Sequence, residues 1–186
     1  RTARRRAFAL ALIATLAACG GGGTDDSTDD GNPQPPPPPP PSVRAGRLQS
    51  AALLGSIPAA DIAAALSDRE SLVEGVVPRY SVTAYRLEYL TSDADGNEVR
   101  ASGLVSVPQK PAGATSPVLG YQHGTLFRDA EAPSNNAVAS EVAVVLASLG
   151  YIVLAPDYVG FGASKGTPHP YLLAAPSADA TVDFLP

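Results

Sequence analysis

The chain has 186 residues, with 13 lysines and arginines against 18 aspartates and glutamates, one cysteine, two histidines and a formal net charge of −5. This length is that of one domain of modest size, or of part of a larger one. An acidic chain lacks the basic face that phosphate contacts need, so nucleic acid is excluded as a general partner. One cysteine excludes an intramolecular disulfide, and one cysteine with two histidines is too few for a structural zinc site.

Residues 1–18 have the pattern of an export signal. A basic stretch, Arg4 to Arg6, precedes an apolar run that is too short to cross a hydrocarbon core of about 30 Å as a helix. The run ends in Leu16-Ala17-Ala18-Cys19, which resembles a bacterial lipobox, a signal that is cut before its cysteine. We therefore expect residues 1–18 to be a lipoprotein signal peptide and Cys19 to be lipidated. The alternative is an ordinary signal peptide in which Cys19 occupies this position by chance.

The residue after the cysteine bears on the destination of the protein. Gly20 stands where lipoproteins retained at the inner membrane usually have aspartate, so we expect export to the cell envelope as an outer-membrane lipoprotein. Several acyl chains on one cysteine hold a protein firmly to a membrane, whereas a single chain binds only marginally. The membrane is therefore an expected partner, through the N-terminal lipid anchor. The arginine run also resembles a twin-arginine signal, which leaves the export route open.

Residues 19–46 have the composition of a linker. They are rich in glycine and proline and include seven consecutive prolines, Pro35 to Pro41. Such a segment lacks the apolar residues of a core, so we expect it to be disordered or extended. Seven prolines in the polyproline II conformation span about 20 Å. We favour a spacer over a binding site for a proline-recognising partner.

The globular body, residues 47–186, begins with one helix and a hairpin. Ile62 to Leu66 predicts a short helix. Tyr80 to Tyr89 is rich in β-forming residues and predicts a strand. Asp93 to Asn97 is typical of a turn, and Val99 to Val107 predicts the returning strand of a hairpin.

The second half of the body predicts alternating strands and helices. Val118 to Tyr121 predicts a short buried strand, and Tyr151 to Ala155 predicts a strand buried on both faces. Between them we expect a helix from Asn136 to Leu149, ended by Gly150, and Ser177 is expected to cap a last helix. The helix from Asn136 to Leu149 has a predicted apolar face, formed by Val138, Val142, Val145, Leu146 and Leu149. The order predicts an α/β fold, in which an antiparallel hairpin is followed by parallel strands with helices.

Four segments of the body carry a family likeness. Tyr121-Gln122-His123-Gly124-Thr125 is followed by Ala132-Pro133-Ser134, by residues 147–162 with the sequence ASLGYIVLAPDYVGFG, and by His169-Pro170-Tyr171. In this order they resemble the secretory lipase branch of the α/β-hydrolase superfamily. The resemblance covers about residues 48–186. It implies the N-terminal half of an α/β-hydrolase sheet, truncated before the nucleophile elbow.

The same resemblance implies half of an acyl-transfer site. In the superfamily, a turn after the third strand offers a backbone N–H to the developing oxyanion. By position, that donor is Thr125, with Leu126 the next candidate. His123 is expected to shape the turn, and Gly124 to let the backbone come close to a ligand. The alternative is an ordinary turn at the end of a strand.

Ser164 lies in a formal match to the G-x-S-x-G nucleophile elbow, residues 162–166. An elbow needs a strand that ends at the motif and a helix that begins at the serine. The predicted strand ends near Ala155, and Pro168 and Pro170 leave little room for a helix. We therefore expect Ser164 to lie in a loop and not to be the nucleophile.

Two further polar residues follow the predicted strand. We expect Asp157 to be a hydrogen-bond acceptor that fixes the loop, in preference to a triad acid. His169 is expected to shape the same loop or to line the rim of a pocket. The sequence has no glycine-rich phosphate loop and no paired metal carboxylates, so we expect no cofactor and no metal.

The full-length protein is expected to be a serine carboxylic-ester hydrolase, of lipase or esterase type. We expect the catalytic serine, acid and histidine beyond Pro186, and small-molecule esters or acylglycerols, and hence lipid catabolism, as the substrate class. The chain by itself is then expected to be inactive and marginally folded, with a bare sheet edge at Val118 to Tyr121. The alternatives are a peptidase or amidase of the same fold, and a non-catalytic envelope lipoprotein.

Overall fold

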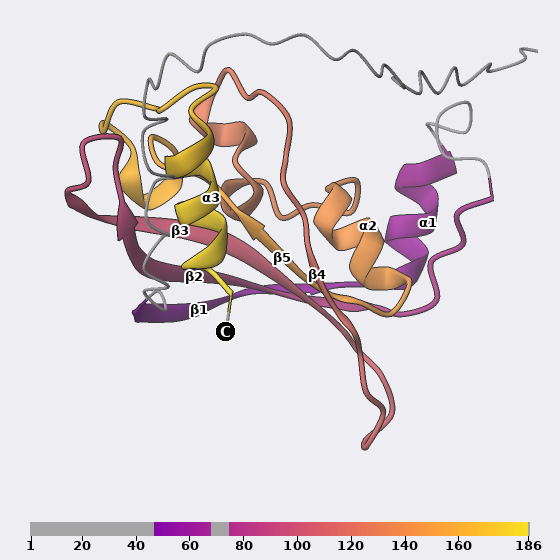
Figure 1. The fold of residues 1–186 in the computed structure, drawn as a ribbon. Helices are drawn as coiled ribbons and strands as arrows, with labels where there is room; N and C mark the ends of the chain where they lie inside the picture. Colours follow the sequence, from indigo (N-terminus) through magenta and orange to yellow (C-terminus); the bar gives the residue numbers. More distant parts are fainter. Residues whose placement is uncertain (1–46, 68–74, 186) are drawn as a thin grey trace, which may run out of the picture. The chain divides into compact units, whose positions relative to one another are not determined.

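The computed structural model describes residues 47–67 and 75–185 (Figure 1). The predicted signal peptide, Cys19 and the whole predicted linker lie outside the described residues. Within the described ranges, no helix combines the length and the apolar character needed to span a membrane.

In the described part of the chain, five strands form one mixed sheet in the order β1-β2-β3-β5-β4. The pairs β1 with β2, β2 with β3 and β3 with β5 are antiparallel, whereas β4 with β5 is parallel. This arrangement confirms the predicted α/β sheet with an antiparallel hairpin before the parallel strands. The strand bounds are β1 Leu48–Ile57, β2 Val82–Ser92, β3 Glu98–Pro108, β4 Val118–Gly120 and β5 Ile152–Pro156.

The hairpin of β2 and β3 closes through the predicted turn. Asp93 Oδ1 accepts hydrogen bonds from the N–H groups of Asp95 and Asn97, at 2.9 and 2.8 Å. The register then runs without interruption from the pair Ser92 and Glu98 to the pair Val82 and Pro108. The turn residues and the regular pairing together thus determine the register of the β2–β3 hairpin.

The first strand, β1, was not predicted. Its sequence, LQSAALLGSI, is rich in alanine, serine and leucine, and most of its side chains are exposed. It pairs with β2 with register shifts between Leu48 and Ser50 and between Leu53 and Gly55. Pairing with a well-formed neighbour stabilises this strand, and the side-chain pattern that identifies a half-buried strand is missing.

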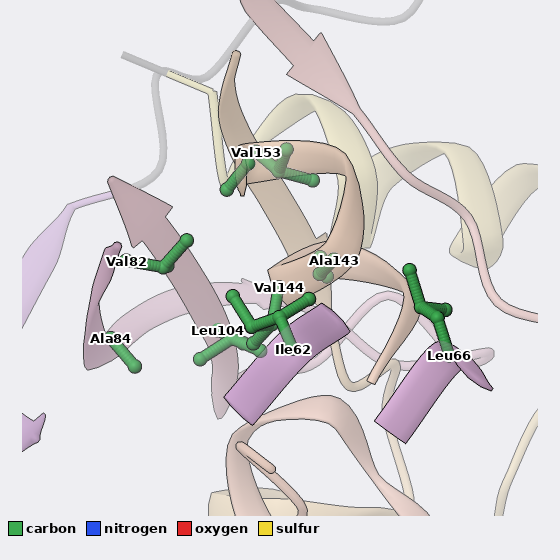
Figure 2. Close-up of a cluster of buried hydrophobic side chains, with 10 residues drawn as sticks. Ile62, Leu66, Val82, Ala84, Leu104, Ala143, Val144 and Val153 are labelled. Carbon is green, nitrogen blue, oxygen red and sulfur yellow. The ribbon is translucent and has the colours of Figure 1, made fainter. Parts of the chain in front are cut away.

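Within residues 47–67 and 75–185, three α-helices and three short 3₁₀ turns accompany the sheet. The helices α1 and α2 lie side by side (Figure 1), and the buried side chains of Ile62, Val144 and Val153 meet in one core cluster (Figure 2). Tyr89, Leu154 and Phe184 form a second cluster. Because Val153 and Leu154 are neighbours on β5, they point to opposite faces. The bounds are α1 Ala59–Ser67, α2 Val142–Ser148, α3 Ala174–Val182, η1 Asp129–Glu131, η2 Pro133–Asn135 and η3 Gly162–Ser164.

The helix α2 corrects the sequence prediction in its start and in its face. It begins at Val142, not at Asn136, because residues 133–135 form the separate turn η2. Val138 and Val142, predicted to be buried, are 46% and 44% exposed. Small side chains let a helix approach a sheet closely, so the buried residues are Ala143, Val144, Ala147 and Ser148.

Two further predictions are wrong in detail. Val118 was predicted to be buried but is 53% exposed, whereas the position of β4 at an edge of the described sheet agrees with the bare edge predicted there. Ser177 does not cap α3, since the helix begins at Ala174 and the Ser177 hydroxyl donates to the Leu173 carbonyl oxygen. Gly150 does end α2, with φ of 115° and an N–H that donates to Ala147.

Candidate active site

The turn after β4 and the loop after β5 lie at the same edge of the sheet. The two strands are parallel neighbours, with Gly120 paired to Leu154, so their carboxyl ends meet there. This edge is where open α/β sheets bind ligands. A pocket of about 260 Å³ opens between the two segments, and its lining includes His123, Thr125, Tyr158, His169 and Tyr171.

The His123 side chain connects the two segments. Its Nδ1 lies 2.7 Å from the Gly124 carbonyl oxygen, and its Nε2 lies 3.3 Å from the Asp157 carbonyl oxygen. A neutral imidazole has one N–H and therefore donates to one of these oxygens at a time. The ring also contacts the Tyr158 ring, with centroids 4.5 Å apart. The side chain therefore links the turn after β4 to the loop after β5.

The turn after β4 contributes three consecutive residues, Gly124, Thr125 and Leu126, to the lining of the pocket. Within the described residues, the N–H groups of Gly124, Thr125 and Leu126 have no hydrogen-bond acceptor. The next two, from Phe127 and Arg128, donate to Glu131 Oε2 at 3.1 and 3.2 Å. Gly124, Thr125 and Leu126 all line the pocket, and the resemblance names Thr125, with Leu126 next, as the expected donor.

The Asp157 carboxylate fixes the loop after β5. The residue is fully buried, and its carboxylate accepts hydrogen bonds from Ser102 Oγ at 2.6 Å and from the Ser134 N–H at 2.8 Å. The Ser134 hydroxyl donates to the same carboxylate. Its position at the end of β5 and these three donors support the role that the sequence predicted, a loop-fixing acceptor.

The glycine–serine segment at residues 162–166 belongs to this fixed loop. Ser164 is 3% exposed, and its hydroxyl accepts from the Gly160 N–H and donates to the Phe161 carbonyl oxygen. It lies in the 3₁₀ turn η3, eight positions after the end of β5 at Pro156. A nucleophile elbow needs the strand to end at the motif, so this geometry agrees with the rejection of Ser164.

His169 lines the pocket and also shapes the loop, so both predicted roles describe it. Its Nδ1 lies 2.6 Å from the Val159 carbonyl oxygen, and its ring packs edge-on against Phe161 at 4.9 Å between centroids. The Cβ and backbone of His169 leave no space beside Gly160, where an added Cβ would lie 2.7 Å from the His169 Cβ. His169, near the end of the loop, thus contacts Val159 and Phe161, near its start.

Backbone strain is concentrated at this pocket. Among the described residues, two that are not glycine have positive φ, namely Tyr158 at 63° and Leu172 at 61°, and both line the pocket. Side chains rarely adopt this left-handed conformation, which persists only where the surrounding structure imposes it. Strain of this kind gathers at functional sites.

Burial changes the acid–base properties of the groups around the site. It raises the pKa of the Tyr158 phenol and of the Tyr121 phenol, and the nearby Glu141 carboxylate adds to the effect on Tyr121. Burial also raises the pKa of the Glu141 carboxyl group. Both phenols therefore remain protonated hydrogen-bond donors at neutral pH.

Sequence reasoning found the turn but missed several residues that complete the pocket. Tyr158, Tyr171 and Leu172 line it, although no role had been assigned to any of them. Tyr158 and Tyr171 lie inside the segments that carry the family likeness, so that likeness was the available signal. Within the described ranges, no three histidine, cysteine, aspartate or glutamate side chains are grouped as a metal site would require.

Solved structures identify the fold. A proposed hydrolase from Legionella pneumophila is 31% identical, with a TM-score of 0.65 over 74% of this chain. The rice cell wall degrading esterase LipA from Xanthomonas oryzae is 29% identical, with a TM-score of 0.62 over 74% of this chain. The chain has an α/β-hydrolase fold. It spans only 37% and 35% of the lengths of these two proteins.

The described sheet thus resembles part of the sheet in two larger proteins, a proposed hydrolase and an esterase. No protein-family model matches the chain, and no curated protein does so either. The assignment of the fold therefore rests on the structural likeness alone.

Proposed function

We propose that this chain is the N-terminal part of a serine carboxylic-ester hydrolase and supplies the oxyanion-binding half of its active site. In this proposal the nucleophilic serine, the acid and the catalytic histidine come from residues after Pro186. The Thr125 N–H, with Leu126 as the next candidate, donates to the carbonyl oxygen of the ester as it becomes an oxyanion.

The observation that carries the proposal is the position of the His123-Gly124-Thr125 turn. It follows β4 directly, opens on the pocket and presents N–H groups without acceptors among the described residues. An acyl-transfer enzyme needs such donors fixed before the reaction begins, because they then cost no reorganisation in the transition state. The Asp157 network supplies the fixed neighbour against which His123 is held.

The proposal is tested by steady-state hydrolysis with the full-length protein. We expect turnover of p-nitrophenyl esters and of acylglycerols, and little turnover of the matched anilides, because an amide has a poorer leaving group. Faster cleavage of anilides than of esters would favour the peptidase or amidase alternative. A folded full-length protein that hydrolyses neither class would contradict the proposal and favour a non-catalytic envelope protein.

The name of one structural neighbour bears on the substrate. LipA is described as a rice cell wall degrading esterase, and one of its structures is ligand-bound. We propose that small-molecule esters are the substrates here as well. A series of esters with acyl chains of increasing length tests the chain-length preference.

We also propose that the protein is anchored to the outer membrane through lipid on Cys19. The apolar run that ends at this cysteine supports the proposal. Cells that express the full-length protein should incorporate a labelled fatty acid into it, and the Cys19→Ala variant should lose the label and leave the membrane fraction. Labelled protein in the Cys19→Ala variant would contradict the anchor.

A further inference from the structure

Two hydroxyl groups meet at the mouth of the pocket. Thr125 Oγ1 lies 3.1 Å from the Tyr171 phenol oxygen, which is hydrogen-bond distance. Thr125 belongs to the turn after β4, whereas Tyr171 belongs to the segment that leads into α3. The contact therefore joins the proposed oxyanion turn to the opposite wall of the same pocket.

The backbone around Tyr171 places its side chain in this position. The Tyr171 N–H donates to the His169 carbonyl oxygen at 2.8 Å, and the Leu173 N–H donates to Pro170 at 3.1 Å. Leu172, between them, has the left-handed φ of 61°. Leucine rarely adopts this conformation, which persists only where the surrounding structure imposes it. The surrounding structure therefore holds the turn that contains Tyr171 in one conformation.

A count of protons shows what the pair can do. Two hydroxyl groups carry two protons, and the single hydrogen bond between them uses one. If the Tyr171 phenol is the donor, the Thr125 O–H remains free to donate to a third atom. Thr125 Oγ1 is three covalent bonds from the Thr125 nitrogen, so both donors of this residue can reach one substrate oxygen.

We propose that the Tyr171 phenol donates to Thr125 Oγ1, and that the Thr125 O–H joins the Thr125 N–H in binding the carbonyl oxygen of the ester. The inference rests on the proposed function and adds a catalytic group to it, with Tyr171 as a positioning residue. The phenol also polarises the threonine hydroxyl and makes it a stronger donor.

The chemical step explains why such a donor acts on kcat. The serine oxygen forms a bond to the carbonyl carbon, its proton moves to the histidine, and the π electrons of the carbonyl move to the oxygen. A hydrogen bond to the resulting oxyanion is stronger than one to the neutral carbonyl. The threonine hydroxyl therefore stabilises the transition state more than the bound ester, which raises kcat and leaves KM nearly unchanged.

The test is a double-mutant cycle in the full-length protein with one p-nitrophenyl ester. We expect Thr125→Val to lower kcat by about tenfold to a hundredfold, with KM changed by less than about twofold. Thr125→Ser, which keeps the hydroxyl, should retain most of the wild-type kcat. Tyr171→Phe should lower kcat by about threefold to tenfold and have no further effect in the Thr125→Val background, because Tyr171 acts through Thr125.

Tyr151→Phe is the matched control. It makes the same chemical change at a 38% exposed tyrosine, beside the start of β5 and therefore at the opposite end of that strand from Asp157. Its kcat should equal that of the wild type. Thr125→Ala is a second deletion of the hydroxyl, and thermal unfolding of every variant separates a loss of function from a loss of folded protein.

Three outcomes would overturn the inference while leaving the proposed function intact. They are an unchanged kcat in both Thr125→Val and Thr125→Ala, losses in Tyr171→Phe and Thr125→Val that multiply in the double variant, and a rise in KM without a fall in kcat. A wild-type protein that hydrolyses no ester would instead overturn the proposed function itself.

Discussion

The two segments at the carboxyl edge of the sheet are built in opposite ways. The loop after β5 is organised around the fully buried Asp157 carboxylate, which accepts hydrogen bonds from Ser102 and Ser134. The turn after β4 follows an edge strand, and Gly124 and Thr125 are exposed. The first segment is fixed by buried hydrogen bonds, whereas in the second the N–H groups of Gly124, Thr125 and Leu126 have no acceptor among the described residues.

The two segments differ in their expected roles: the loop after β5 supports the site, and the turn after β4 is proposed to contact the substrate. His123 contacts both segments, because its two ring nitrogens lie near the carbonyl oxygens of Gly124 and Asp157. The fixed loop can thus set the position of the open turn without itself contacting a substrate. Changes in the β5 loop should therefore reduce stability first, whereas changes in the β4 turn should reduce activity alone.

The largest expected effect is that of Asp157→Ala. The substitution removes the acceptor of three buried donors, so the free energy of unfolding of the full-length protein should fall by roughly 3–5 kcal/mol. Chemical denaturation measures the change, and Asp95→Ala, in the exposed hairpin turn, is the control. A loss below about 1 kcal/mol would show that this carboxylate does not fix the loop.

A second test compares two glycines of the same loop. Gly162 and Gly166 both have positive φ, but an added Cβ at Gly162 would collide with Ser102 Oγ and with the Asp157 carboxylate, whereas space is open at Gly166. Gly162→Ala should cost about 2–4 kcal/mol and Gly166→Ala about 1–2 kcal/mol. Equal losses in thermal or chemical denaturation would mean that backbone conformation alone, and not the buried network, determines the requirement for glycine.

Gly124→Ala tests the open turn. A Cβ added there has no atom within 4 Å, so the stability should change by less than about 0.5 kcal/mol. The methyl group would nevertheless stand beside the proposed donors, so kcat/KM for an ester should fall by about tenfold or more. An unchanged kcat/KM would remove Gly124 from the substrate side of the turn, and a large loss of stability would erase the contrast with Gly162.

The smallest expected effect concerns pH. Burial raises the pKa of the Glu141 carboxyl group in the folded protein above its ordinary value of 4.5, so the folded state binds this proton more tightly than the unfolded chain. The free energy of unfolding should therefore fall as the pH rises from about 4.5 through the raised pKa. Glu141→Gln should weaken that dependence and be more stable than the wild type at neutral pH. Identical pH profiles in chemical denaturation would contradict this account.

The sequence predicted those parts of the fold whose signals are local. The hairpin turn at Asp93, the apolar strand β5 and the loop role of Asp157 were all recognised. The strand β1 and the buried face of α2 were not, because each depends on the neighbour against which it packs and not on its own pattern. A short range of sequence also cannot reveal that Thr125 and Tyr171 meet, since the contact depends on the left-handed turn at Leu172.

The central claim is that the turn at Thr125 binds the oxyanion, while the nucleophilic serine lies after Pro186. Labelling of the full-length protein with a fluorophosphonate, followed by peptide mass spectrometry, tests it most directly, because the reagent bonds to an activated serine. The account predicts one labelled serine after Pro186 and no label on the 186-residue chain alone. Label on Ser164, in either protein, would contradict it.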